Sequence, residues 1–278
     1  MPKISPVSAM LVAQLPHVKV ETFTLHSTHL NREVQVDLYM PRFDLNLASM
    51  VIFNDGQDLV TMHFEEILEG LYDRLQLQPL VCVGVHCGPE RIQEYGMTVG
   101  PDFKGRGAKA GEYQHFLLEE LLPEIYRHYL EGITVKETAI GGFSLGGLNA
   151  LDLAWNNPDL FKKVGVFSGS LWWRSKDKTD REFNENSSRM MHQQIRNSSK
   201  KQGLRFFFEC GELDEKEDRN NNGVIDSIDD TIDLLRELLK KGYLEGPDFS
   251  YLQLPDGKHD VPTWARSLPF FLRWGWGR

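Results

Sequence analysis

A serine between two glycines is the first feature of this sequence that could do chemistry. Gly142, Ser144 and Gly146 have the G-x-S-x-G spacing. A short apolar run at 138–140 precedes them, and an apolar helical pattern with small residues follows at 145–155. In this strand–turn–helix context such a serine is held exposed as a nucleophile. The sequence therefore predicts that Ser144 is a nucleophile. The alternative is a glycine-rich turn that packs or binds a phosphate.

A serine hydroxyl needs a base to become a nucleophile, and the base needs a carboxylate to orient it. In sites of this type the acid and then the histidine follow the serine along the chain. His192 lies in a polar helical segment and is interpreted as a surface residue, whereas His259 comes just after the last apolar strand pattern. We predict His259 as the base, against the alternative of an ordinary loop histidine.

The predicted acid lies at the end of the preceding strand pattern. Asp214 stands three residues past Gly211, where the chain has left the strand. We therefore predict Asp214 as the carboxylate that orients His259. Glu212 and Glu215 compete for this role, and an acidic loop can also be simply solvated.

A developing oxyanion needs backbone donors. The N–H of Leu145, at the start of the helix after the serine, is the first predicted donor. The second is expected at Gly56 or Gln57, because these residues follow an earlier apolar strand pattern, at 50–53.

A second constellation follows the predicted acid. Residues 218–229 match the twelve-residue calcium-loop template, with Gly223 at the sharp turn. The last position is Asp instead of the usual Glu, and a strand with a loop, not a helix, precedes it. The alternative is an acidic surface turn. We expect a structural calcium ion that stiffens the loop carrying Asp214. The predicted ligands are Asp218, Asn220, Asn222, Val224 through its carbonyl, Asp226 and Asp229.

These residues need elements that bring strand ends together. Apolar runs alternate with helical patterns along the chain, which predicts an α/β fold with a mostly parallel central sheet and helices on both faces. Two alternating patterns near the N-terminus predict antiparallel edge strands. The expected strands are 18–26, 34–40, 50–53, 80–85, 138–140, 164–167, 204–210 and 249–254, and the expected helices are 64–75, 112–129, 145–155, 187–195, 231–241 and 261–272.

The chain as a whole excludes some classes of function. It has 278 residues, a length that fits one domain over 1–278 with 1–16 as a loose arm. The net charge of -9 disfavours nucleic acid as a partner. No apolar stretch approaches the ~20 residues needed to cross a membrane. No export signal is visible, which favours a cytoplasmic protein, although a chain that had lost its leader would be exported. The oligomeric state is not indicated.

Several segments together resemble a family. They are GGFSLGGLNAL (141–151), NDGQDL (54–59), ERIQEYG (90–96), EYQHFLLEELLPEI (112–125), FSGSLWW (167–173) and GKHDVPTW (257–264). These segments are similar to the esterase branch of the α/β-hydrolases that includes enterochelin esterases, esterase D and feruloyl or acetyl-xylan esterases. The resemblance covers roughly residues 30 to 275.

The resemblance implies an α/β-hydrolase fold and ester hydrolysis through an acyl-enzyme, with Ser144, Asp214 and His259 in the triad positions. It also implies that Arg91 and Trp172 lie near the substrate. The alternatives are an arginine paired to Glu94 and a core aromatic residue.

The expected function is that of a serine carboxylic-ester hydrolase for a small-molecule ester, with no organic cofactor. Two rival functions remain: an acyltransferase that uses the same triad, and a non-catalytic calcium-binding module on a hydrolase scaffold.

Overall fold

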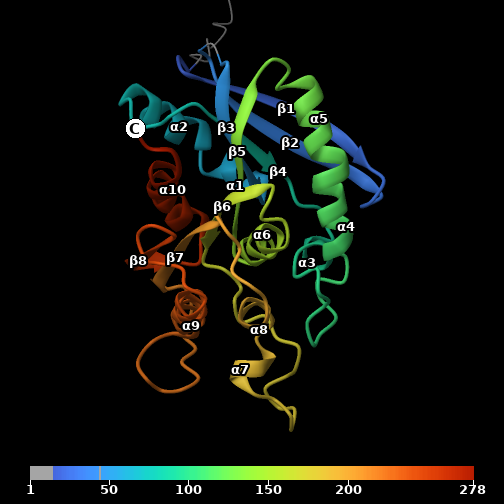
Figure 1. Ribbon diagram of the computed structural model, residues 1–278, viewed down its shortest axis with the longest axis vertical. Coiled ribbons are helices and arrows are strands. Elements are labelled where there is room, and N and C mark those ends of the chain that lie inside the picture. Colours follow the sequence, from blue (N-terminus) through green and yellow to red (C-terminus); the bar gives the residue numbers. More distant parts are fainter. Residues whose placement is uncertain (1–14, 44) are drawn as a thin grey trace, which may run out of the picture.

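One eight-stranded sheet organises the molecule. The computed structural model describes residues 15–43 and 45–278, so most of the predicted N-terminal arm lies outside the described residues. The strand order is β1-β2-β4-β3-β5-β6-β7-β8 (Figure 1). The strands are β1 (Val18–Ser27), β2 (Arg32–Pro41), β3 (Leu47–Asn54), β4 (Leu80–Val85), β5 (Thr134–Phe143), β6 (Phe161–Phe167), β7 (Arg205–Leu213) and β8 (Phe249–Lys258).

The sheet is parallel where the predicted catalytic residues lie. β1 pairs antiparallel with β2, and β2 pairs antiparallel with β4. The remaining pairs, from β3 and β4 to β7 and β8, are parallel. The predicted fold class, with its antiparallel N-terminal edge, is confirmed. The carboxyl ends of β3, β5, β6, β7 and β8 therefore meet at one edge, where ligands bind in open α/β sheets.

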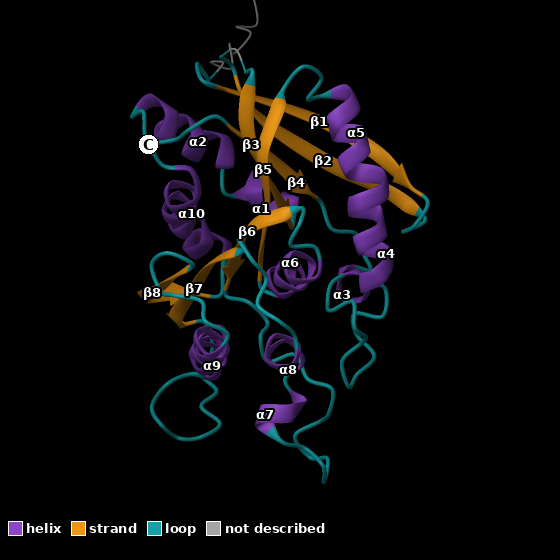
Figure 2. Ribbon diagram, in the orientation of Figure 1, coloured by secondary structure: helices purple, strands orange, loops and turns teal. Residues whose placement is uncertain are grey.

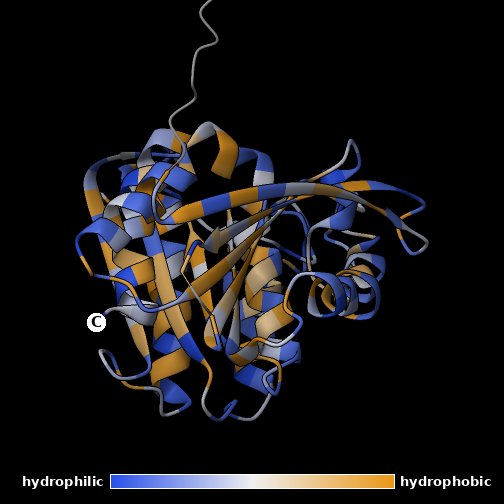
Figure 3. Cartoon of the chain, turned by 90° about the horizontal axis from the view of Figure 1, so that it is seen from above, coloured by the Kyte–Doolittle hydropathy of each residue, from blue (hydrophilic) through white to orange (hydrophobic). Residues whose placement is uncertain are grey.

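Helices cover both faces of the sheet (Figure 2). α1, α2 and α10 pack with one hydrophobic cluster, and α4, α5, α6, α8 and α9 pack with the other. Figure 3 shows the hydrophobic residues gathered along the strands and the hydrophilic ones on the outer helical surfaces. The helices are α1 (Gly56–Thr61), α2 (Phe64–Asp73), α3 (Arg91–Glu94), α4 (Ala110–His115), α5 (Leu122–His128), α6 (Leu145–Asn156), α7 (Glu185–Ser188), α8 (Met190–Asn197), α9 (Asp226–Lys240) and α10 (Val261–Trp276).

The structure differs from the predicted elements in detail. The helix expected at 112–129 contains a π-helical turn, η1 (Phe116–Leu121), shortly before Pro123. Proline has no N–H for the regular bond four residues back, so the helix widens there. The short helices α1 and α3 were not predicted from the hydrophobic periodicity, because one or two turns contain too few residues to reveal a repeat. Among the described residues, no helix has the length and apolar character required to span a bilayer.

The prediction that His192 is a surface residue is wrong. It is 1% exposed on α8, and its Nε2 lies 2.8 Å from the backbone oxygen of Asp230 on α9. Burial lowers the pKa of His192 to about 3, so the ring is neutral. Because the residues next to His192 in the sequence are polar, the sequence did not indicate that one face of this short helix is buried.

Candidate active site

Ser144 occupies a sharp turn between a strand and a helix. β5 ends at Phe143 and α6 begins at Leu145, with Ser144 at φ 55° and ψ -119°. Its N–H donates to the oxygen of Phe167 on β6 at 2.8 Å. A Cβ on Gly142 would overlap the backbone oxygen of Gly146, so the close approach of strand and helix requires glycine. The geometry is that of the strand–turn–helix predicted from the motif.

Backbone strain gathers at three neighbouring strand ends. Asp55 after β3, Ser144 after β5 and Ser168 after β6 have φ values of 61°, 55° and 45°. These strands are adjacent in the sheet. A positive φ is uncommon for residues other than glycine, and such residues cluster at active sites. This edge of the sheet is therefore the candidate active site.

Asp214 and His259 follow paired strand ends. Leu213, the last residue of β7, is paired in register with Lys258, the last residue of β8. The next residues are Asp214 and His259. The carboxylate of Asp214 turns back over the strand, with Oδ1 2.7 Å from the place that a Cβ on Gly211 would occupy. The register brings the predicted acid and base to one place.

The charges of these two residues act on each other. Burial raises the pKa of Asp214, while the Ser168 side chain and His259 act in the opposite direction. His259 is exposed as a residue, yet the protein around its ring lowers the pKa of His259 by desolvation; Asp214 opposes this effect and Arg91 adds to it. A base kept neutral at neutral pH can accept the proton of a serine.

The competing acids are directed elsewhere. The exposed Glu212 accepts a hydrogen bond from Gln253 at 2.8 Å. Glu215 accepts the backbone N–H of Ser227 in α9 at 2.5 Å. Of the three carboxylates, Asp214 is the one that perturbs His259.

Arg91 pairs with Asp55 and not with Glu94. Its Nε and Nη2 donate to the two oxygens of Asp55 at 2.6 and 2.7 Å, and Asp55 is fully buried. Glu94 pairs instead with Arg32 at 2.7 Å. Because Asp55 Oδ2 lies 2.5 Å from the place of a Cβ on Gly146, Arg91 is held beside the serine turn. About a third of its side chain, 32%, remains exposed.

The predicted oxyanion donors lie in the first turns of two helices. Leu145 begins α6, and Gly56 and Gln57 begin α1 after β3, which neighbours β5. The first N–H groups of a helix have no intrahelical acceptor, so they are free to bind an anion. Both turns lie at the same edge of the sheet as Ser144.

Trp172 is half-buried and borders a cavity of about 430 Å³. The guanidinium of Arg106 lies 4.9 Å from the centre of a Trp172 ring. Glu215, the neighbour of Asp214, also lines this cavity. Trp172 also packs against the larger hydrophobic core, so its position is compatible with both the predicted role near the substrate and that of a core aromatic residue.

Comparison with known proteins agrees with this geometry. The family described as "Putative esterase" matches residues 27–274. The chain belongs to this esterase family. The family predicted from the motifs is confirmed.

Solved structures share the fold of this esterase-family chain. Enterochelin esterase from Shigella flexneri superposes with a TM-score of 0.72 at 20% identity, covering 94% of this chain and 59% of that one. The siderophore hydrolase EstB from Aspergillus nidulans superposes with a TM-score of 0.65 at 17% identity, covering 96% and 98%.

A curated relative is named "Uncharacterized protein YbbA", from Bacillus subtilis. It is 26% identical over 161 residues, which are 55% of this chain and 63% of that protein. This esterase-family chain thus aligns with less than two thirds of the Bacillus protein and of the Shigella enzyme.

The predicted calcium loop joins β7 to α9. Asn220 and Asn222 donate amide hydrogen bonds to Asp229 at 2.8 and 3.0 Å, and Asp218 accepts the N–H of Gly223 at 2.9 Å. The side chains of Asn220, Asn222 and Asp229 thus meet, and Asp218 accepts backbone N–H groups of the same loop. Asp226 turns aside and accepts the N–H of Arg219 at 2.8 Å.

Two of the converging side chains are amides. Among residues 15–43 and 45–278, no three His, Cys, Asp or Glu side chains are grouped as metal ligands.

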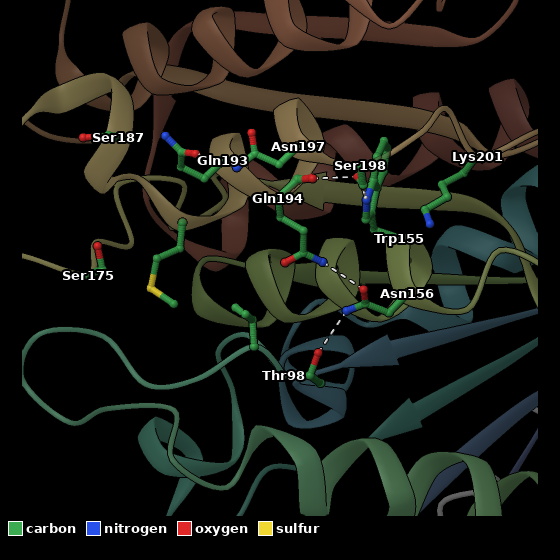
Figure 4. Close-up of a pocket in the computed structure, with 12 residues that line it drawn as sticks. Thr98, Trp155, Asn156, Ser175, Ser187, Gln193, Gln194, Asn197, Ser198 and Lys201 are labelled. Atoms are coloured by element: carbon green, nitrogen blue, oxygen red, sulfur yellow. Dashed lines mark hydrogen bonds between the residues drawn. The ribbon is translucent and has the colours of Figure 1, made fainter.

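A larger cavity lies away from the candidate active site. It has a volume of about 530 Å³ and lies beside Trp155 and Asn156, at the end of α6, and beside α8 (Figure 4). Ser144 precedes the other end of this twelve-residue helix, ~16 Å away at 1.5 Å per residue. The volume of a cavity alone therefore does not identify the candidate active site.

Sequence reasoning missed three residues of the site in this esterase-family chain: Asp55, Ser168 and Trp264. Each lies in a segment that carried the family resemblance. The signal was present for Asp55 and Ser168, because polar residues that closely follow an apolar strand pattern mark the sheet edge. The partners of these residues depend on contacts between distant segments.

Proposed function

We propose that this protein is a carboxylic-ester hydrolase with Ser144 as nucleophile, His259 as base and Asp214 as orienting acid. The observation that carries the proposal is the strained serine turn after β5, at the sheet edge where the paired ends of β7 and β8 bring Asp214 to His259. The printed names of solved relatives, which are esterases and a siderophore hydrolase, support this class of reaction.

The reaction has two halves. His259 takes the proton of the Ser144 hydroxyl as Oγ attacks the ester carbonyl carbon, and the carbonyl oxygen becomes an oxyanion held by backbone N–H groups. The oxyanion collapses, the C–O bond to the alcohol breaks, and His259 returns the proton to the leaving alkoxide. Water, deprotonated by His259, then attacks the acyl-enzyme, and Ser144 is released with a carboxylic acid.

Arg91 and Trp172 would contact the substrate. Arg91 is held by Asp55 and is close enough to His259 to lower the pKa of that residue. Trp172 borders the 430 Å³ cavity next to the loop of the acid. A cation and an aromatic surface suit an ester with an anionic or aromatic acyl group. Feruloyl esters and siderophore lactones have such groups.

The test is covalent labelling followed by product analysis. A fluorophosphonate probe should label the wild-type protein once, on Ser144, and a panel of p-nitrophenyl, feruloyl and siderophore esters should yield free acid. Products are measured with and without a competing alcohol. A transfer product as the main species would assign an acyltransferase, and no labelling with calcium present would favour the non-catalytic module.

We also propose that residues 218–229 bind a calcium ion. The support is the spacing of Asp218, Asn220, Asn222 and Asp229, which matches the calcium-loop template. Three of these side chains already meet in the loop, because the amides of Asn220 and Asn222 donate to Asp229. Asp226 would act through a water or turn inward. The ion would connect the loop after Asp214 to the start of α9.

Removal of calcium should lower stability and ester turnover together. Because the ion would bind the folded loop alone, saturating calcium should raise the melting temperature by about 5 °C over the chelated protein. Thermal melts and turnover are measured with EGTA and after adding calcium back.

Asp218→Ala should abolish the response to calcium, whereas Asp159→Ala, an exposed aspartate elsewhere, should retain it. A melt of the wild type that is identical with and without calcium would contradict the proposal.

A further inference from the structure

Ser168 is a buried serine in an uncommon conformation at the candidate active site. It follows β6, is 2% exposed and has a φ of 45°. Its N–H donates to the backbone oxygen of Glu209 on β7 at 2.8 Å. This bond fixes the backbone of Ser168 against β7, the neighbour of β6 in the sheet.

The hydroxyl of Ser168 has a donor that sets its direction. Nε1 of Trp264, on α10, donates to Ser168 Oγ at 3.0 Å, and the tryptophan is 6% exposed. An indole N–H can donate and cannot accept. Ser168 Oγ is therefore the acceptor of this bond, and its own proton is free for another partner.

Asp214 lies near enough to the Ser168 side chain for that side chain to affect its pKa. Neither of its carboxylate oxygens has a partner that meets strict hydrogen-bond geometry within residues 15–43 and 45–278, although both are buried. The Ser168 side chain favours the charged form of Asp214 and lowers its pKa. Burying a carboxylate without a hydrogen-bond donor costs free energy, so a hydroxyl oriented toward Asp214 would stabilise its charged form.

The same indole contacts the residues that carry the base and the nucleophile. Trp264 packs on Phe143, directly before Ser144, with ring centres 5.2 Å apart and planes 22° apart. It meets the His259 ring edge-on at 5.3 Å. One side chain of α10 therefore links the ends of β5, β6 and β8.

We propose that Trp264 and Ser168 are positioning residues for the catalytic acid and base: Trp264 orients the Ser168 hydroxyl, which donates to Asp214, and the indole edge fixes the ring of His259. This inference rests on the proposed function, because it assigns roles around the same triad. It adds two residues that act through Asp214 and His259 without contacting the substrate.

Removal of the hydroxyl should lower turnover and move the pH profile. In Ser168→Ala we expect kcat to fall about 10- to 100-fold with KM little changed, since a hydrogen bond to a charged group has that effect. The Asp214 carboxylate then has one hydrogen-bond donor fewer, so its negative charge is less dispersed and stabilises protonated His259 more strongly. This raises the pKa of His259. The acid limb of kcat/KM should therefore move to higher pH by about 0.5 to 1.

A double-mutant cycle tests the order of action. Trp264→Phe keeps the packing on Phe143 and His259 but removes the N–H, so it should lower kcat in the same direction. The double variant should be no worse than Ser168→Ala, because both changes remove one unit. The matched control is Trp276→Phe on the same helix, whose Nε1 has no hydrogen-bond partner among the described residues.

A titration without turnover separates this proposal from the proposed function. In a Ser144→Ala background, the pKa of His259 followed by NMR should rise by about 0.5 to 1 when Ser168 is also changed to Ala. The other charged and titratable groups that face Asp214 and His259 are unchanged in all variants. They are Arg91, Glu209, Asp260, Tyr251 and Cys210.

Three outcomes are decisive. Absent ester turnover in the wild type would overturn the proposed function, and the NMR titration would still decide the positioning roles. An unchanged His259 pKa, or losses in the two single variants that multiply in the double, would overturn the positioning proposal. Where Ser168→Ala does not fold, Ser168→Gly removes the same hydroxyl and suits the positive φ.

Discussion

Replacing Ser144 with alanine is expected to lower kcat for ester hydrolysis by about 10⁴- to 10⁶-fold, because no other group can form the acyl-enzyme. The remaining rate would come from the oxyanion donors and from binding. KM should change little, since the hydroxyl contributes mainly to the transition state. Turnover of the best ester, measured with purified variants, checks this, and labelling by a fluorophosphonate should disappear.

Replacing Ser144 with glycine instead of alanine distinguishes the effect of backbone strain on stability from the loss of the nucleophile. Ser144 is held at φ 55°, and relief of such strain should raise the free energy of unfolding of Ser144→Gly by about 1 kcal/mol or more over Ser144→Ala. Both variants should be inactive.

Leu75→Gly is the matched control, because Leu75 has the same φ of 55° at an exposed position away from the site. This variant should gain stability and keep its activity. Urea unfolding gives the free energies, and substantial ester turnover by either Ser144 variant would refute the assigned nucleophile.

The sequence allowed the candidate triad to be predicted because of a property of parallel sheets. Their strands end at one edge, so residues just after apolar runs converge although they are far apart in the chain. Ser144, Asp214 and His259 each follow such a run, and the register of β7 with β8 brings the last two together. The order along the chain then assigns their roles.

The partners of these residues could not be predicted in the same way. A pair with Glu94, three residues along the chain, was the alternative for Arg91, but Arg91 pairs with Asp55, which is 36 residues away. The bond from Trp264 to Ser168 joins residues separated by 96 positions. Such contacts depend on how a helix packs on the sheet, and hydrophobic periodicity does not specify that packing. His192 illustrates the same limit, because a polar segment can still bury one face.

Glu209 is predicted to cost the protein stability, and Glu209→Gln should raise the free energy of unfolding at pH 7 by about 2 to 3 kcal/mol. The side chain lies on β7 and is 1% exposed. No hydrogen bond of strict geometry reaches either carboxylate oxygen among the described residues, and the Ser267 side chain and the Ser168 backbone only partly oppose the rise in the pKa of Glu209. Burial, and then the charge of Asp214, raise the pKa of Glu209 from 4.5 to about 8.

The direction of the pH dependence follows from proton uptake. Between pH 4.5 and about 8 the folded protein keeps the proton on Glu209, whereas the unfolded chain has lost it. The folded state then binds more protons, so stability decreases as pH rises through this window. Glutamine has no proton to lose. The gain from Glu209→Gln should be absent below pH 4.5, grow with pH, and level off above about pH 8.

Unfolding by urea across this pH range measures the effect. Glu131→Gln, an exposed position, is the control and should stay within about 0.5 kcal/mol of the wild type at each pH. Ester turnover of Glu209→Gln near pH 7 should be close to that of the wild type, because the amide resembles the protonated acid in charge and shape. A gain in stability that does not depend on pH would mean that Glu209 is ionised in the folded protein. The negative charge of Glu209, next to Asp214, would then also affect the pKa of His259.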